Sequence, residues 1–285
     1  MRAASLLIRR GSTFALVVLG SSIVFGGLLW FAPGSKLGAA GEGSFLGWFV
    51  DFWVGVFTGD LGRSYRGYPV SQMVVKGAGR SIPLIGAGLL LSLTAGLAIA
   101  FAAGPRLRVA GRSMRALVHA LSLCPVFLLG YLALVLFAVP PEGAGQALAA
   151  VAILAIGDGM LSDVVLGLDA ELARLRRKDF VQSARLRGTP LWRHFVPHLA
   201  LPVAQIAASR MAWLIGGVLV LEMVLGIQGI GLIGYKAADT ADFPLLVAIT
   251  VFVTTLVAGS ALLVDVLRVA VDPRVRKDRR AAGRA

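Results

Sequence analysis

Long apolar stretches alternate with short polar segments along the chain. A helix needs about 20 apolar residues to cross the hydrocarbon of a bilayer. Six runs reach that length, at residues 12–33, 81–105, 116–141, 144–168, 199–221 and 243–264. The fourth run carries Asp158 and Asp163, the fifth carries Arg210, and the other four are free of charge. The pattern predicts an all-α, polytopic membrane protein with about six transmembrane helices.

Composition supports the same class. Hydrophobic residues make up 57% of the 285 residues, charged residues make up 15%, and the mean hydropathy is +0.82. Soluble domains are nearer half apolar with about a quarter of residues charged. A soluble globule of this size would have too little polar surface, so we expect the lipid bilayer to solvate much of the chain.

The net charge of +13 is explained by its distribution. With the N-terminus inside, inner segments hold 21 Lys and Arg residues and outer segments hold six. This asymmetry favours two cytoplasmic termini and accounts for the charge without nucleic acid. The prediction is a cytoplasmic N-terminus over 1–10, a transmembrane domain over 11–271 and a basic cytoplasmic tail over 272–285. The uncharged run 11–35 is too long for a signal peptide, so we expect it to be retained.

Aromatic residues recur in the first outer loop, which we place at 34–80. They follow three- and four-residue steps, at Phe45, Trp48, Phe49, Phe52, Trp53 and Phe57. This spacing predicts a short helix with an aromatic face. The helix either lies at the membrane–water interface or packs against the transmembrane bundle, and the sequence favours neither.

The longest inner loop, 169–198, has a defined pattern. Residues 169–187 read as a basic amphipathic helix, Gly188 stops it, and Thr189-Pro190 turns the chain. A second short segment, 191–198, leads back to the membrane. Such a helix and turn suit docking of a soluble partner or adhesion to anionic lipid, and the pattern leaves both open.

This loop carries a resemblance to a known family. Residues 179–188 read DFVQSARLRG, with His198 ten residues after Gly188. The segment resembles the cytoplasmic coupling loop of permeases in dipeptide, oligopeptide and nickel ABC importers. Further segments resemble that family in order along the chain: APG at 32–34, GDLGRS at 59–64 with PV at 69–70, EMVLGIQGIG at 222–231 and DPRVR at 272–276. The APG that ends the first run resembles the corresponding ending in the first of the family's two permease chains.

The resemblance implies a type I ABC importer transmembrane domain in the cytoplasmic (inner) membrane of a prokaryote. It implies that this chain forms half of the translocation pathway for peptides or a related small solute such as nickel. The implied partners are a second permease subunit, two ATPase subunits and an extracytoplasmic solute-binding protein. ATP and Mg are then bound by the ATPase subunits. No Lys of the chain follows a Gly, so the phosphate-binding G-x-x-x-x-G-K motif is absent and this chain is not its own ATPase.

The resemblance also implies roles for particular residues. The ATPase-coupling loop contains Asp179, Ala184, Arg185, Arg187, Gly188 and His198. The outer-loop motif contains Gly59, Asp60, Leu61 and Gly62. Gly229 and Gly231 belong to a segment near the pathway or gate.

Charges within or directly beside the runs add three pathway candidates, Arg210, Asp158 and Glu222, because such charges are costly in hydrocarbon and are paired or line a cavity. Arg210 falls near mid-depth, where it either pairs with a carboxylate, with Asp158 as the leading candidate, or contacts a solute carboxylate. Glu222 falls at the outer end of its run, where we expect it to line the external mouth. Neither the histidines nor Cys124 have spacing that suggests a metal site. The alternative function is an ion-coupled secondary transporter or channel without an ATPase partner.

Overall fold

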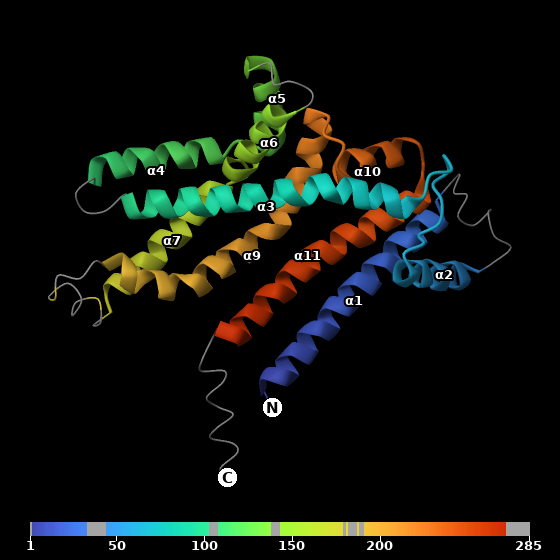
Figure 1. Ribbon diagram of the computed structural model, residues 1–285, viewed down its shortest axis with the longest axis horizontal. Coiled ribbons are helices and arrows are strands. Elements are labelled where there is room, and N and C mark those ends of the chain that lie inside the picture. The colour runs from blue at the N-terminus through green and yellow to red at the C-terminus, as the bar shows by residue number, and fades with distance from the viewer. Residues whose placement is uncertain are drawn as a thin grey trace, which may run out of the picture. The chain divides into compact units, whose positions relative to one another are not determined.

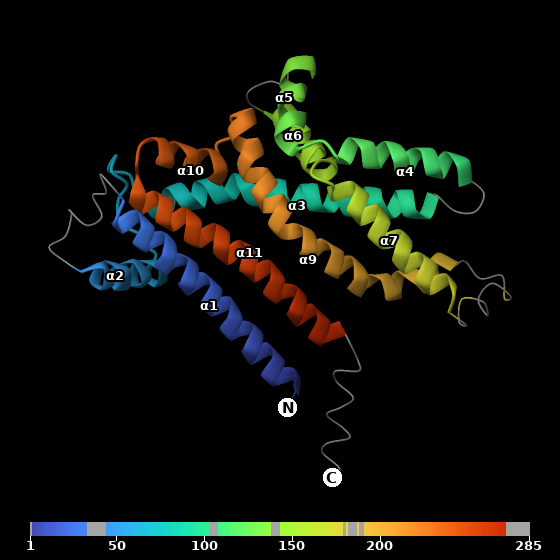
Figure 2. The same ribbon diagram turned by 180° about the vertical axis from the view of Figure 1, so that it is seen from behind.

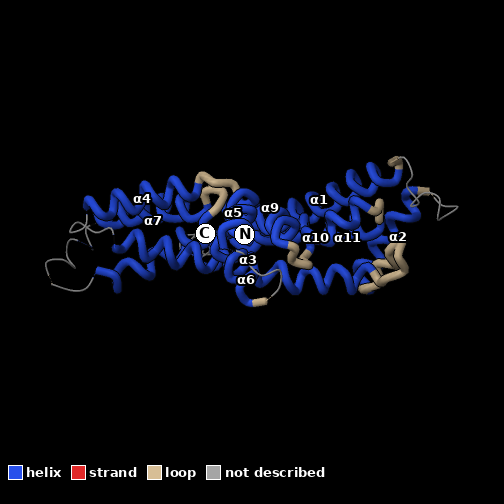
Figure 3. The backbone as a smooth tube through the Cα atoms, turned by 90° about the horizontal axis from the view of Figure 1, so that it is seen from above, coloured by secondary structure: helices blue, strands red, loops and turns tan. Residues whose placement is uncertain are grey.

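The computed structural model describes residues 2–32, 44–102, 108–137, 143–178, 181, 187 and 191–271. The described residues are helices joined by short loops, with no strand among them (Figure 3). The helices are α1 (Arg2–Trp30), α2 (Phe45–Thr58), α3 (Val70–Ala102), α4 (Arg108–Ser122), α5 (Val126–Phe137), α6 (Ala144–Ile156), α7 (Met160–Arg176), α9 (Leu191–Leu225), α10 (Ile230–Asp239) and α11 (Phe243–Val271). The predicted all-α class is confirmed for this part of the chain.

Four helices are long and apolar enough to cross a membrane, in α1, α3, α9 and α11. Two bent helix pairs pass the same test, α4 with α5 and α6 with α7, which gives up to six spans if each pair is one span. The expected number of spans therefore holds. Several boundaries differ, because α3 begins at Val70 rather than Ser81 and α9 begins at Leu191 rather than after the cytoplasmic loop.

The third and fourth apolar runs each form a bent pair of helices, whereas the sequence predicted one continuous span for each. The axes of α4 and α5 differ by 94°, and those of α6 and α7 by 48°. Pro125 lies in the first break, where a proline cannot donate a helix hydrogen bond. The second break holds Asp158 and Gly159 at φ values of 49° and 77°, which right-handed helix does not allow.

The chain forms two compact units. The first contains residues 1–83 and 218–262. Helices α1 and α11 run side by side in it (Figures 1 and 2), with Val18 packed against Val247 and Val251. A second buried cluster joins α3, α10 and α11 through Val70, Ile230 and Leu245 among others.

Helix α2 belongs to this first unit and confirms the predicted aromatic helix. Ser44 accepts a hydrogen bond from the Gly47 N–H at its start, and Gly59 ends it with φ of 81°. Trp48, Phe52 and Trp53 pack against the α1–α11 cluster, which supports the bundle-packing alternative for this face. Leu46, Val50, Val54 and Phe57 remain exposed on the helix.

The second unit contains residues 84–217 and 263–285. Helix α4 packs along α7, and α6 lies against α5, α7 and α4. Val118, Leu161 and Val165 form a buried cluster that Ala95 and Ile99 of α3 also contact. Close packing on α3 depends on small residues, because a Cβ at Gly96 would lie 2.4 Å from Val164 Cγ1.

Candidate functional site

The outer-loop motif forms a hydrogen-bonded turn after α2. Gly59 caps the helix in the left-handed conformation, and the Gly62 N–H donates to Asp60 Oδ1 at 3.0 Å. A Cβ at Gly55 would lie 2.3 Å from the Asp60 carbonyl oxygen, so the turn folds back closely on α2. Leu61 packs on the cluster of α3, α10 and α11. The motif thus builds and anchors a turn in the first unit.

The turn is joined to the start of α11 by a contact that sequence reasoning missed. The Ser64 hydroxyl donates to Asp242 Oδ2, and the Tyr65 N–H donates to Oδ1 at 3.4 Å. Asp242 directly precedes α11 and is 3% exposed. The sequence signal for this contact was a carboxylate between two hydrophobic segments. A carboxylate that becomes buried needs hydrogen-bond donors from elsewhere in the chain.

Glu222 lies at the centre of a buried polar cluster in the same unit. Its side chain, on the last turn of α9, accepts hydrogen bonds from Ser81 Oγ on α3 at 2.6 Å and from the Gly231 N–H at 2.7 Å. Ser81 Oγ in turn accepts from the Ile230 N–H at 2.9 Å. These bonds join α3, α9 and the first turn of α10.

This arrangement corrects the expectation that Glu222 lines an external mouth. The residue is 1% exposed, and its oxygens are occupied by protein donors. Gly229 and Gly231 make the close approach possible. A Cβ at Gly229 would lie 2.1 Å from Glu222 Oε1, and one at Gly231 would lie 2.1 Å from the Leu219 carbonyl oxygen. The absence of a side chain at both glycines therefore allows the α9–α10 connection to pack closely.

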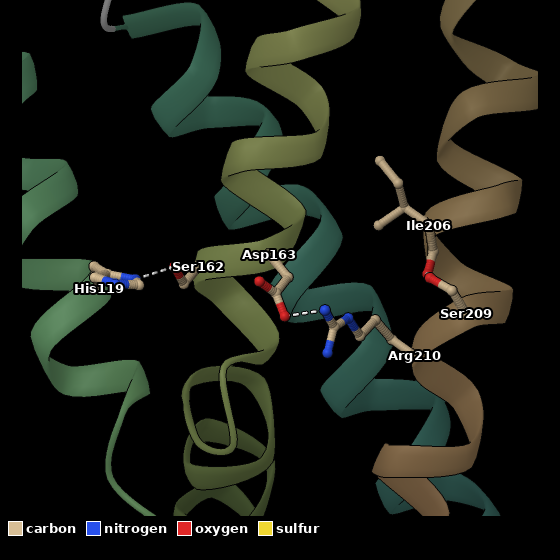
Figure 4. Close-up of polar contacts among 6 residues, drawn as sticks. All are labelled: His119, Ser162, Asp163, Ile206, Ser209 and Arg210. Atoms are coloured by element: carbon tan, nitrogen blue, oxygen red, sulfur yellow. Dashed lines mark hydrogen bonds and ion pairs between the residues drawn. The ribbon is translucent and has the colours of Figure 1, made fainter.

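Arg210 pairs with a carboxylate, as expected for a cation in a transmembrane run. Figure 4 shows its guanidinium on α9 directed at Asp163 on α7, with which it forms an ion pair. The side chains are 25% and 35% exposed respectively, so the pair lies at the edge of the second unit rather than in its core. The prediction that Asp158 is the leading candidate for this partner was wrong.

Asp158 instead stabilises the broken spans. Its Oδ1 atom accepts from the Val126 N–H at the start of α5, at 3.1 Å. The two breaks also bond to each other, from Asp158 N–H to the Cys124 carbonyl at 3.3 Å and from Gly159 N–H to the Ser122 carbonyl at 2.6 Å. Backbone groups inside a bilayer need such internal partners. Asp158 therefore caps a helix, and it also lines a small cavity beside Arg210.

His119 has a structural partner within the second unit. Its Nδ1 lies 2.7 Å from Ser162 Oγ, which joins α4 to α7 (Figure 4). The neighbouring Asp163 on α7 pairs with Arg210 on the other side. Within the described part of the chain, no group of three or more His, Cys, Asp or Glu residues could hold a metal ion.

Most of the predicted coupling loop lies outside the described residues, including Asp179, Ala184, Arg185 and Gly188. Arg187 is exposed in a turn. The backbone of His198 belongs to α9, and its side chain is not among the described ones. The predicted helix over 169–187 is helical only as far as Arg176, where α7 ends, so it does not continue unbroken to Arg187. The segment 191–198 leads back toward the membrane as the first part of α9.

Comparison with known proteins gives a consistent match. Residues 88–277 match the family model described as the binding-protein-dependent transport system inner membrane component. A probable peptide ABC transporter permease protein of Sinorhizobium fredii is 28% identical, over 80% of this chain and 79% of that protein. The oligopeptide transport system permease protein OppB of Salmonella typhimurium is 27% identical, over 76% of each chain, and OppB of Escherichia coli matches with the same values.

Proposed function

The chain belongs to the family of binding-protein-dependent transport system inner membrane components, and from this we infer that it is a permease subunit of an ABC importer for peptides. The observation that carries the proposal is the match to this family over residues 88–277. The relatives named as peptide or oligopeptide permeases support peptides as the solute class. A permease moves solute and performs no chemistry on it.

The division of labour is part of the proposal. This chain forms half of the pathway and a second permease subunit forms the other half. Two ATPase subunits bind ATP and Mg on the cytoplasmic side, and an extracytoplasmic binding protein delivers solute. The absence of a G-x-x-x-x-G-K motif in the sequence supports an ATPase on separate chains. Coupling then passes through residues 179–188 and His198.

The proposed location is the inner membrane of a prokaryote, with both termini in the cytoplasm. The excess of Lys and Arg in the segments assigned to the inside supports this orientation. The turn at 59–62, the Glu222 cluster and helix α10 then lie toward the outer side. The cytoplasmic side contains the end of α7 and the start of α9, on either side of the coupling loop.

The structure suggests how the outer end keeps its shape during transport. Helix α10 is short, and short helices are marginal unless tertiary contacts hold them. Glu222 and Ser81 supply acceptors to the N–H groups of Gly231 and Ile230 at its start. We propose that α10 moves together with the ends of α3 and α9 when the pathway opens.

Reconstitution tests the proposal against its alternative. The chain is co-expressed with its second permease and ATPase subunits, purified, and placed in proteoliposomes with the binding protein. Importer function predicts co-purification of the ATPase and peptide uptake that requires ATP inside the vesicle and is lost with a hydrolysis-deficient ATPase. Uptake driven by an ion gradient, with no ATPase retained, would instead indicate the secondary transporter.

A further inference from the structure

The first unit contains a cavity of about 640 Å³ whose lining is strongly basic. Four cations line it, from three parts of the chain: Arg66 in the turn after α2, Lys76 and Arg80 on α3, and Lys236 on α10. Only six Lys and Arg residues fall in the segments assigned to the outer side, and these four are among them. In membrane proteins, Lys and Arg are enriched in cytoplasmic segments. That tendency does not explain a cluster of cations on the outer side.

The four cations have no anionic partner in the described part of the chain. None of them forms an ion pair there, and Arg80 donates only to the Gln228 carbonyl, at 3.3 Å. Asp242 is the one carboxylate in the lining. Its oxygens are occupied by the Ser64 hydroxyl and the Tyr65 N–H. The cavity therefore has an excess of positive charge that faces solvent.

The cavity has the size and mixed character of a small-solute site. Ligand pockets typically measure about 300–1,000 Å³. Apolar side chains of Met73, Ile233 and Leu245 lie between the charged groups. A flexible lysine attracts an anion as a point charge without the fixed geometry of a bidentate arginine contact. Such a lining selects solutes by negative charge and tolerates variation in the rest of the molecule.

We propose that this cavity binds the carboxylate groups of acidic peptides on the outer side of the permease. The proposal rests on the peptide-importer function and adds a preference for anionic solutes. The acidic surface of a soluble partner protein is a different occupant. The hollow shape favours the small solute, because docking of a protein surface needs complementary area rather than a cavity.

Direct binding tests the preference without the binding protein. The purified complex of permease and ATPase subunits is dialysed to equilibrium against radiolabelled Ala-Glu-Glu and Ala-Ala-Ala. The intact complex should bind Ala-Glu-Glu more tightly, and rising salt should weaken the difference. Lys76→Gln with Lys236→Gln should weaken Ala-Glu-Glu binding about fourfold or more, at about twofold or more for each exposed charge, and leave Ala-Ala-Ala nearly unchanged.

Two control variants separate charge from structure. Lys76→Arg with Lys236→Arg keeps the charges and should retain acidic-peptide binding. Arg63→Gln removes an exposed outer cation that is not part of the lining and should leave the preference intact. Equal binding of the two peptides by the intact complex would overturn the proposal, as would equal weakening of both by the neutral variants.

Uptake measurements distinguish this proposal from the importer function itself. If ATP-driven uptake of neither peptide occurs with the intact complex, the importer function fails. If uptake occurs but the neutral lysine variants slow both peptides equally and lose retention of the binding protein, the cavity docks that protein and the acidic-peptide proposal is wrong. Selective loss of Ala-Glu-Glu uptake, with Ala-Ala-Ala uptake and binding-protein retention preserved, is the expected result.

Discussion

Glu222 Oε2 accepts a 2.7 Å hydrogen bond from the backbone N–H of Gly231, in the first turn of α10. Gly229 precedes that helix and has no side chain with which to cap it. Glu222, at the end of the preceding helix α9, therefore caps the N-terminus of α10. A carboxylate at a helix N-terminus is also favoured by the helix dipole. The contact explains why a carboxyl group is tolerated in the buried end of a transmembrane helix.

Ser81 completes this cap, which gives a matched pair of substitutions on α3. Ser81→Ala removes the acceptor of the Ile230 N–H and a donor to Glu222. Leaving buried polar groups unsatisfied costs about 1–3 kcal/mol, so Ser81→Ala should lower the free energy of unfolding by that amount. Chemical unfolding in detergent measures it.

Ser92→Ala is the control for this prediction. Ser92 is also buried on α3, but its hydroxyl donates only to the Leu89 carbonyl of its own helix. Its replacement removes no hydrogen bond between helices and should change stability by about 0.5 kcal/mol or less. Similar losses for the two variants would mean that the cluster around Glu222 does not stabilise the fold.

The Arg210–Asp163 ion pair predicts energetic coupling between α9 and α7. Arg210→Gln leaves Asp163 without its cation, and Asp163→Asn leaves Arg210 without its anion. Each should destabilise the chain, while the double variant should cost less than the sum, with a coupling of about 1 kcal/mol or more. Unfolding of the four proteins of this double-mutant cycle measures the coupling.

A second cycle tests the assignment of the partner. Asp158→Asn keeps an oxygen that accepts from the Val126 N–H and should couple to Arg210→Gln more weakly than Asp163→Asn does. Stronger coupling of Arg210 to Asp158 than to Asp163 would restore Asp158 as the partner and contradict the arrangement in Figure 4.

The hydrophobic runs were sufficient to predict the number of spans but not their breaks. Run length measures how much apolar chain is available, and neither Pro125 nor the Gly-Asp-Gly at 157–159 interrupts the runs. The breaks are stabilised by each other, through backbone bonds between residues distant in sequence. Periodicity along one segment cannot reveal such a pairing.

The same limit explains which site residues were predicted. Arg210 and Glu222 were identified because a charge within or beside an apolar run is conspicuous, but their partners were not identified. The break in the fourth span takes Asp158 into a capping role and leaves Asp163, on the first turn of α7, to pair with Arg210. Ser81 is unremarkable in the sequence, and only the fold brings it to Glu222.

The charge asymmetry predicts which residues can be labelled from outside the cell. In a chain with Cys124 replaced by Ser, single cysteines at Gly41 and Thr240 should react with a membrane-impermeant maleimide added to intact cells. A cysteine at Ala281, in the basic tail, should react only after the membrane is opened. Labelling of the Ala281 variant in intact cells would rule out a cytoplasmic C-terminus.

The last prediction concerns Gly188 and the coupling loop. A docking element needs little bulk at its contact point, and Ala184 and Gly188 are four residues apart in the sequence, the spacing of neighbours on one helical face. Gly188→Val adds a β-branched side chain there, which costs about 1 kcal/mol or more if the residue adopts a positive φ. The variant should insert in the membrane normally but lose the ATPase subunits or uncouple ATP hydrolysis from uptake. Arg185 and Arg187 should contribute charged contacts to the ATPase subunits at the same interface.

Co-purification of the ATPase and peptide uptake in proteoliposomes measure this effect. Gly11→Val is the matched control, because it adds the same side chain in the N-terminal part of α1, where a Cβ would meet no atom within 4 Å. It should retain both the ATPase and uptake. Normal ATPase retention and normal uptake in Gly188→Val would mean that this loop does not couple the permease to ATP hydrolysis. Loss of both in the Gly11→Val control would show instead that added bulk on the cytoplasmic side disturbs the complex without regard to position.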